Sequence, residues 1–119
     1  MLREAKARQI PGEPRRRWFR DEDFDLFVWF APDETICGFQ LCYDKQEDQH
    51  AFTWFAGCAA THHRVDEPDE AYAYGQSPML VAGNALPAER VGMEFVAASV
   101  RLEPAIRTLV QQTLRASKV

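Results

Sequence analysis

Residues 24–43 read FDLFVWFAPDETICGFQLCY, and this stretch decides the fold. Large apolar side chains recur at every second position on both sides of a turn formed by Pro32, Asp33 and Glu34. Alternation with this period is typical of β-strands, and proline favours the first corner of a tight turn. The stretch therefore predicts an antiparallel hairpin of strands 24–30 and 36–43.

Strict alternation divides the side chains of this hairpin between two faces. The first face receives Phe24, Leu26, Val28, Phe30, Cys37, Phe39, Leu41 and Tyr43. The second face receives Phe27, Trp29, Ile36, Gln40 and Cys42. Because the second face is too apolar to be left in water, we expect a long loop, a ligand or another subunit to cover it.

The strand pattern extends outward from the hairpin, since eleven of the fourteen aromatic residues lie between Trp18 and Phe55. We expect a strand ending at Trp18 and Phe19 and further strands at 51–55, 71–74 and 79–81. Residues 57–70 are interpreted as an acidic surface loop. Residues 1–14, interrupted by two prolines and a glycine, are interpreted as an N-terminal arm or an edge strand.

Two helices are expected at the C-terminal end, because Pro87 and Pro104 can each occupy a first helical turn. The apolar residues that follow recur at helical spacing: Val91, Phe95 and Ala98, then Ile106, Leu109, Val110, Thr113 and Leu114. The sequence thus predicts one α+β domain, 1–119. An antiparallel β-meander of four to six strands (15–82) is packed on one face by two helices (87–117).

Charge is segregated along the chain. Residues 1–20 hold seven bases and two acids, whereas residues 21–75 hold two bases and thirteen acids. Opposite charges on successive elements favour ion pairs within the chain or between subunits, so a homodimer is expected. The overall charge of −4 counts against nucleic acid as the main partner.

An odd number of cysteines, with no signal peptide and no run of 18 apolar residues, favours a reducing compartment away from membranes. We therefore expect a cytoplasmic protein.

Three stretches carry a resemblance to a known family: GEPRRRWF at 12–19, DLFVWF at 25–30 and FQLCYDK at 39–45. Together they resemble a family of small, uncharacterised bacterial single-domain proteins. The resemblance covers about residues 3–55, with a weaker similarity at 78–81. It implies a bacterial cytoplasmic protein and no particular activity.

Metal ligands are the first candidate chemistry. Cys37 and Cys42 are separated by an odd number of residues on one expected strand, so they point to opposite faces. Together with Cys58 they are interpreted as buried free thiols. His62, His63 and Asp66 form a more plausible set, and a metal-assisted hydrolase is the first alternative function. The other interpretation of these residues is a solvated loop without a cofactor.

Arginines beside aromatic residues are the second candidate. Arg15, Arg16 and Arg17 precede Trp18 and Phe19, and such a run can contact phosphates while bases stack. Nucleic-acid or acidic-partner binding through Arg15–Arg17 is therefore the second alternative function. Ion pairs with carboxylates of the same molecule, in the neighbouring stretch 21–25, are the competing interpretation.

Nucleophile motifs and glycine-rich phosphate loops are absent from the sequence, which favours a non-enzymatic protein. The most favoured function is a non-catalytic domain that binds a partner or itself through the second sheet face. Gln40 is notable there, because an amide on an apolar face requires a hydrogen-bond partner. The expected partner-binding residues are Arg16, Arg17, Trp18, Phe27, Trp29 and Gln40.

Overall fold

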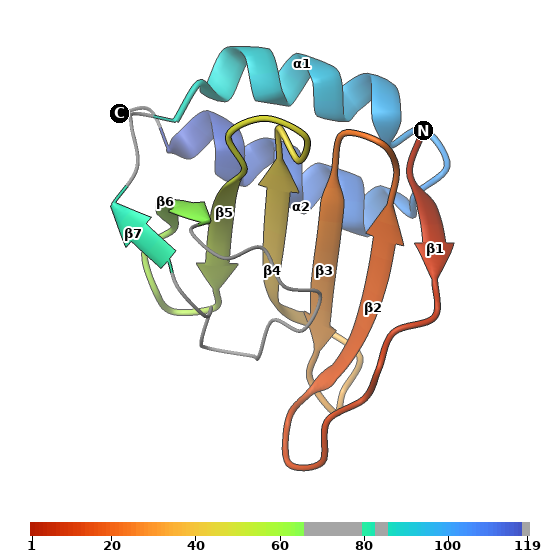
Figure 1. Ribbon diagram of the computed structural model, residues 1–119. Helices are drawn as coiled ribbons and strands as arrows, with labels where there is room; N and C mark the ends of the chain where they lie inside the picture. Colours follow the sequence, from red (N-terminus) through yellow and green to blue (C-terminus); the bar gives the residue numbers. More distant parts are fainter. Residues whose placement is uncertain (66–79, 83–85, 118–119) are drawn as a thin grey trace.

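The computed structural model describes residues 1–65, 80–82 and 86–117, and these form one antiparallel sheet with two helices against one of its faces (Figure 1). The strands are β1 (Arg3–Ala5), β2 (Arg15–Arg20), β3 (Asp25–Phe30), β4 (Ile36–Tyr43), β5 (His50–Phe55), β6 (Thr61–Val65) and β7 (Leu80–Ala82). They are arranged in the sheet in the order in which they occur in the chain. The predicted α+β meander with two C-terminal helices is confirmed.

Helices α1 (Ala88–Ala98) and α2 (Pro104–Ala116) begin at or just after the two expected prolines. Proline is favoured there because its missing N–H would have no partner within the helix anyway. Each helix buries one stripe: Val91 and Phe95 of α1, and Ile106, Val110 and Leu114 of α2.

The main core lies between the helices and the first face of the sheet. Phe95 of α1 contacts Phe24 edge-to-face, with ring centroids 6.2 Å apart and planes at 88°. Buried side chains from the strands and both helices complete this core, among them Phe19, Leu26, Val28, Phe39, Leu41 and Phe52. The amide of Leu2 donates to the carbonyl of Ala98 over 2.8 Å, which ties the N-terminal end of the chain to the end of α1.

A β-bulge between β3 and β4 changes the predicted assignment of two side chains. Phe30 is aligned with Ile36 and Trp29 with Gly38, so Cys37 is the extra residue. A bulge reverses the alternation beyond it. Ile36 therefore packs against the main core and Cys37 against the second face, and the opposite prediction was wrong. Cys37 consequently shares its face with Cys42.

Gly38 at this bulge is required by packing. A β-carbon at position 38 would lie 2.6 Å from Cδ1 of Phe55 on the neighbouring strand β5. Only glycine lets the Phe55 ring approach the backbone so closely.

Part of the expected acidic loop 57–70 is a strand, since residues 61–65 form β6 and pair with β5 and β7. Residues 61–65 contain no acidic residue, and the acids that led to the loop prediction begin only at Asp66. The expected strand 79–81 is β7 at 80–82. The expected strand 71–74 lies outside the described residues. Of the two interpretations of residues 1–14, the edge strand is seen, because Glu4 of β1 is aligned with Phe19 of β2.

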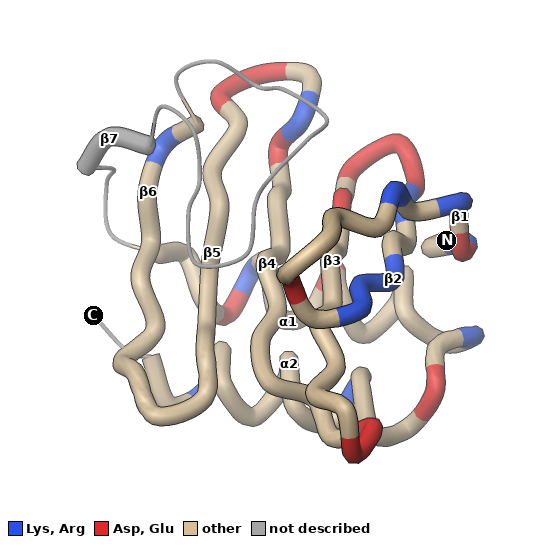
Figure 2. The backbone as a smooth tube through the Cα atoms, turned by 90° about the horizontal axis from the view of Figure 1, so that it is seen from below, with Lys and Arg blue, Asp and Glu red and all other residues tan. Residues whose placement is uncertain are grey.

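Acidic residues gather in the turns that connect the described strands, as Figure 2 shows. Arg15 of β2 pairs with Glu34 in the β3–β4 turn, and the terminal ammonium pairs with Asp21 in the β2–β3 turn. The segregated charges thus meet within one copy of the chain. No helix in the described ranges combines the length and apolar character needed to span a membrane.

Candidate functional site

The second face of the sheet is a second, smaller core. Phe27, Trp29 and Cys42 are at most 3% exposed in a single copy of the chain. The ring of Trp29 lies 6.3 Å from that of Phe27 and 5.8 Å from that of Phe55, centroid to centroid. Trp18 stacks on Phe27 at 5.7 Å and is only partly buried. Phe27 and Trp29, two of the expected partner-binding residues, are therefore packed inside the chain.

Gln40 lies on this face with 1% of its surface exposed. Its side-chain amide donates to the hydroxyl of Thr53 over 2.9 Å, and Thr53 is its direct neighbour on β5. The polar group that was expected to mark a partner or ligand thus has a hydrogen bond inside the molecule.

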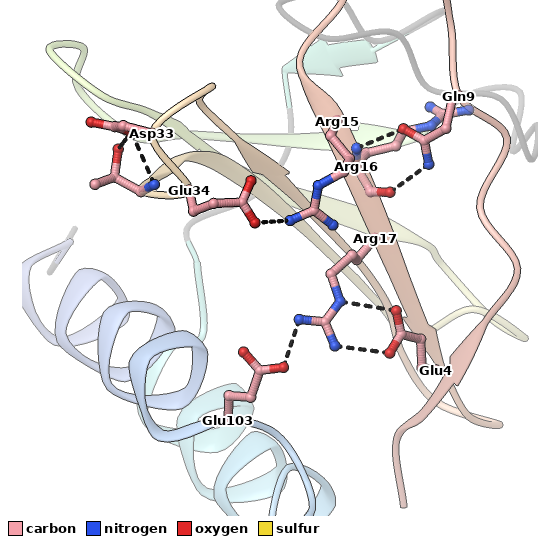
Figure 3. A network of polar contacts seen from close by, with 9 residues as sticks. Glu4, Gln9, Arg15, Arg16, Arg17, Asp33, Glu34 and Glu103 are labelled. Atoms are coloured by element: carbon pink, nitrogen blue, oxygen red, sulfur yellow. Dashed lines mark hydrogen bonds and ion pairs between the residues drawn. The ribbon is translucent and has the colours of Figure 1, made fainter.

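Arg16 is buried as well, at 3% exposure. Its Nε donates to the carbonyl of Arg8 over 2.7 Å, and its guanidinium lies over the ring of Phe27, 5.7 Å from the centroid. Burial lowers the pKa of Arg16. The side chain of Gln9 donates to the carbonyl of Arg16 and accepts from its amide, at 2.8 and 3.0 Å (Figure 3). Gln9 in this way protects an edge of β2 that the short strand β1 leaves uncovered.

Arg17 is the centre of an ion-pair network (Figure 3). Its guanidinium donates twice to Glu4, at 2.9 and 2.8 Å, and once to Glu103 at 2.6 Å. The hydrogen bond with Glu4 raises the pKa of Arg17 and lowers the pKa of Glu4. The network connects β1, β2 and the start of α2. Pairing within the molecule, the competing interpretation of the arginine run, is seen for Arg17, although the partners are not the acids of 21–25.

His62 and His63 are adjacent on β6 and therefore point to opposite faces of the sheet. His62 lies on the helix-covered face beside Tyr43 and His50, whereas His63 is aligned with Ala51. Asp66 lies outside the described residues. Within the described part of the chain, no three His, Cys, Asp or Glu side chains are placed to hold a metal ion. The structure does not bring the two histidines together.

His62 instead belongs to a cluster with Tyr43 and His50. The hydroxyl of Tyr43 lies 2.5 Å from Nε2 of His62, and the two imidazole rings stack with centroids 5.1 Å apart. Nδ1–H of His50 donates to the carbonyl of Asp48 over 2.8 Å. Burial raises the pKa of the Tyr43 phenol, and the charge of Asp44 acts in the same direction. The Tyr43 phenol therefore keeps its proton at neutral pH and shares a hydrogen bond with Nε2 of His62.

Replacing Tyr43 with phenylalanine removes the hydroxyl of this hydrogen bond and keeps the ring. We expect a loss of about 1–2 kcal/mol in the free energy of unfolding at pH 7, because the partly buried Nε2 of His62 loses this hydrogen bond. Since burial raises the phenol's pKa, the wild type is stabilised below the ordinary tyrosine pKa and loses that contribution as the pH rises above about 10. Urea unfolding at about pH 7 and about pH 10.5 should show a smaller difference between the two proteins at the higher pH. An equal difference in unfolding free energy at both pH values would contradict a raised pKa of the Tyr43 phenol.

The three cysteines are free, as expected. Cys42 is buried and Cys37 partly buried, but Cys58 is exposed, which corrects the expectation that all three are buried. Cys58 follows the end of β5 in the connection to β6, whereas the other two lie on a strand that is covered on both faces.

Exposed apolar side chains gather on the helix layer instead of the sheet. Met93 is 70% exposed, Val96 42% and Val100 52%. We name these three residues the α1 stripe: Met93 and Val96 lie three residues apart on one side of α1, and Val100 lies in the turn that follows the helix. Met1, 52% exposed, precedes Leu2, whose amide bonds to the end of the same helix. Among the described residues, these four are all the exposed large apolar side chains.

A groove of about 570 Å³ lies beside the α1 stripe, between the two helices. It is lined by Leu86, Ala88, Glu89, Gly92, Met93 and Val96 on the α1 side and by Gln111, Leu114 and Arg115 on the α2 side. Sequence reasoning missed this surface. The sequence did contain a signal for it, because α1 carries apolar residues on two sides. A helix that only covers a sheet needs a single apolar side.

Comparison of the chain with family models, with curated proteins and with solved structures gave no match. Its function must therefore be inferred from its own residues.

Proposed function

We propose that this protein is a non-catalytic binding domain that contacts another protein through the α1 stripe and the groove beside it. The observation that carries the proposal is the concentration of the exposed large apolar side chains of the described residues on this one surface. Two of them, Met93 and Val96, line the same groove, and apolar side chains gathered in this way mark interaction sites.

The location of the surface differs from the one expected from the sequence. A partner could reach Phe27, Trp29 or Gln40 only by displacing the packing that buries them. The α1 stripe needs no such rearrangement, because Met93 and Val96 already project into solvent. Preformed surfaces bind without the cost of unfolding part of the chain. The three free thiols support a cytoplasmic setting for this contact.

Site-specific photo-cross-linking in the native host tests the proposal. A photoreactive phenylalanine analogue replaces Met93 in one variant and Asp33, which is exposed in the β3–β4 turn, in the control. We expect a discrete cross-linked product from position 93, identified by mass spectrometry, and none from position 33. Identical product patterns from both positions, or no product from position 93, would exclude a binding role for this surface.

A further inference from the structure

The groove between the helices has rims of opposite charge. The helices are antiparallel, so the start of α1 lies beside the end of α2 (Figure 1). Glu89 stands at that end of the groove on the α1 rim and Arg115 on the α2 rim. Both are exposed, and within the described residues neither makes an ion pair. Each is free to meet an opposite charge on an incoming molecule.

Gly92 in the groove is not explained by packing inside the chain. Nothing lies within 4 Å of the point where a β-carbon would be placed. Glycine in the interior of an exposed helix is unfavourable compared with alanine, because the unfolded chain gains more freedom. A glycine that the chain's own packing does not need is consistent with close approach by a partner at that point.

We propose that the partner is a second copy of this chain, packed helix layer against helix layer about a two-fold axis that runs along the groove. This inference rests on the proposed function, since it names the occupant of the same surface. A two-fold axis in that direction places the α1 rim of each copy over the α2 rim of the other. Glu89 of each copy then faces Arg115 of the other, so the complementary pair forms twice.

The same arrangement accounts for the apolar residues. The exposed side chain of Met93 enters the groove of the facing copy, where Gly92 and Leu114 leave space for it. Methionine is unbranched and adapts its shape to such a groove. Burial of the α1 stripe of both copies removes from water the apolar surface that a single copy leaves exposed.

Charge reversal tests the pairing by sedimentation velocity over a range of protein concentrations. Glu89→Arg alone and Arg115→Glu alone each place like charges opposite one another, and we expect dimerisation to weaken by about tenfold or more. In an equimolar mixture, the arginine introduced by the first substitution faces the glutamate introduced by the second, and the unchanged Glu89 and Arg115 face each other. The mixture should therefore form a heterodimer about as readily as the wild type dimerises. Failure of the mixture to associate would overturn the two-fold arrangement.

Gly92→Ala separates the stability of the fold from the stability of the dimer. We expect a higher midpoint of thermal unfolding under conditions where the protein is monomeric, because alanine favours the helix. Dimerisation should be weaker, because the added methyl group occupies space that the partner uses. Unchanged or tighter dimerisation of this variant would overturn the proposed contact at Gly92.

The wild type distinguishes this inference from the proposed function. If it sediments only as a monomer at high micromolar concentration, the second-copy inference is wrong. A cross-link from position 93 to a different protein would then still support the binding function. If neither a dimer nor a cross-link is found, both the second-copy inference and the proposed binding function are excluded.

Discussion

Replacing Phe95 with alanine should lower the free energy of unfolding by about 3–5 kcal/mol, the usual cost of removing a fully buried aromatic ring. Phe95 has no exposed surface and contacts Phe24 edge-to-face, which joins α1 to the sheet. The loss combines the transfer of the ring to water with the cavity that remains. Urea unfolding monitored by far-ultraviolet circular dichroism measures it.

Val96→Ala is the matched control for this substitution, because Val96 is the next residue of the same helix and is 42% exposed. Substitution there should change the unfolding free energy by less than about 0.5 kcal/mol. A similar loss in both variants would mean that the cost does not depend on burial and that Phe95 does not anchor α1.

Replacing Trp29 with alanine should also cost about 3–5 kcal/mol, and it distinguishes two views of the second sheet face. Trp29 is 1% exposed and contacts the rings of Phe27 and Phe55 within one copy. If this face is an internal core, the loss appears in the unfolding of the monomer. If the face is completed by a partner, monomer stability changes little and association is lost instead. Urea unfolding at low micromolar concentration, together with sedimentation, separates the two.

Trp18→Ala serves as the control on the same face. Trp18 is only partly buried, although it stacks on Phe27 and its Nε1–H donates to Asp25 over 3.0 Å. Its removal should cost about 1–2 kcal/mol, less than the removal of Trp29. Equal and small effects at both positions would argue that the second face is not a core.

The sheet and the helices could be predicted because their signals are local. The alternation in 24–43 and the prolines at 87 and 104 each act within one turn or one pleat, so neighbouring residues suffice to recognise them. The exchange of Ile36 and Cys37 could not be predicted in this way. A bulge depends on the register with β3, and register is a property of two strands.

The candidate sites were harder to predict, because burial depends on the whole fold. Arg16 and Gln40 are polar and looked available for a partner, yet contacts with Arg8 and Thr53 hold them inside the chain. His62 and His63 looked like a pair, but a strand separates adjacent side chains. The α1 stripe was overlooked because the buried side of that helix already explained its apolar character.

The order of the strands has a consequence for synthesis on the ribosome. Each strand pairs only with the strands before and after it, and the connections from β2 to β6 are four to six residues long, so these hairpins can close as the chain emerges. Both helices follow the sheet, and the bond from Leu2 to Ala98 joins an early residue to a late one. The face of the nascent sheet that the helices cover therefore stays open until both helices are made. Throughout that interval the open face exposes apolar side chains, which makes the nascent chain prone to aggregation.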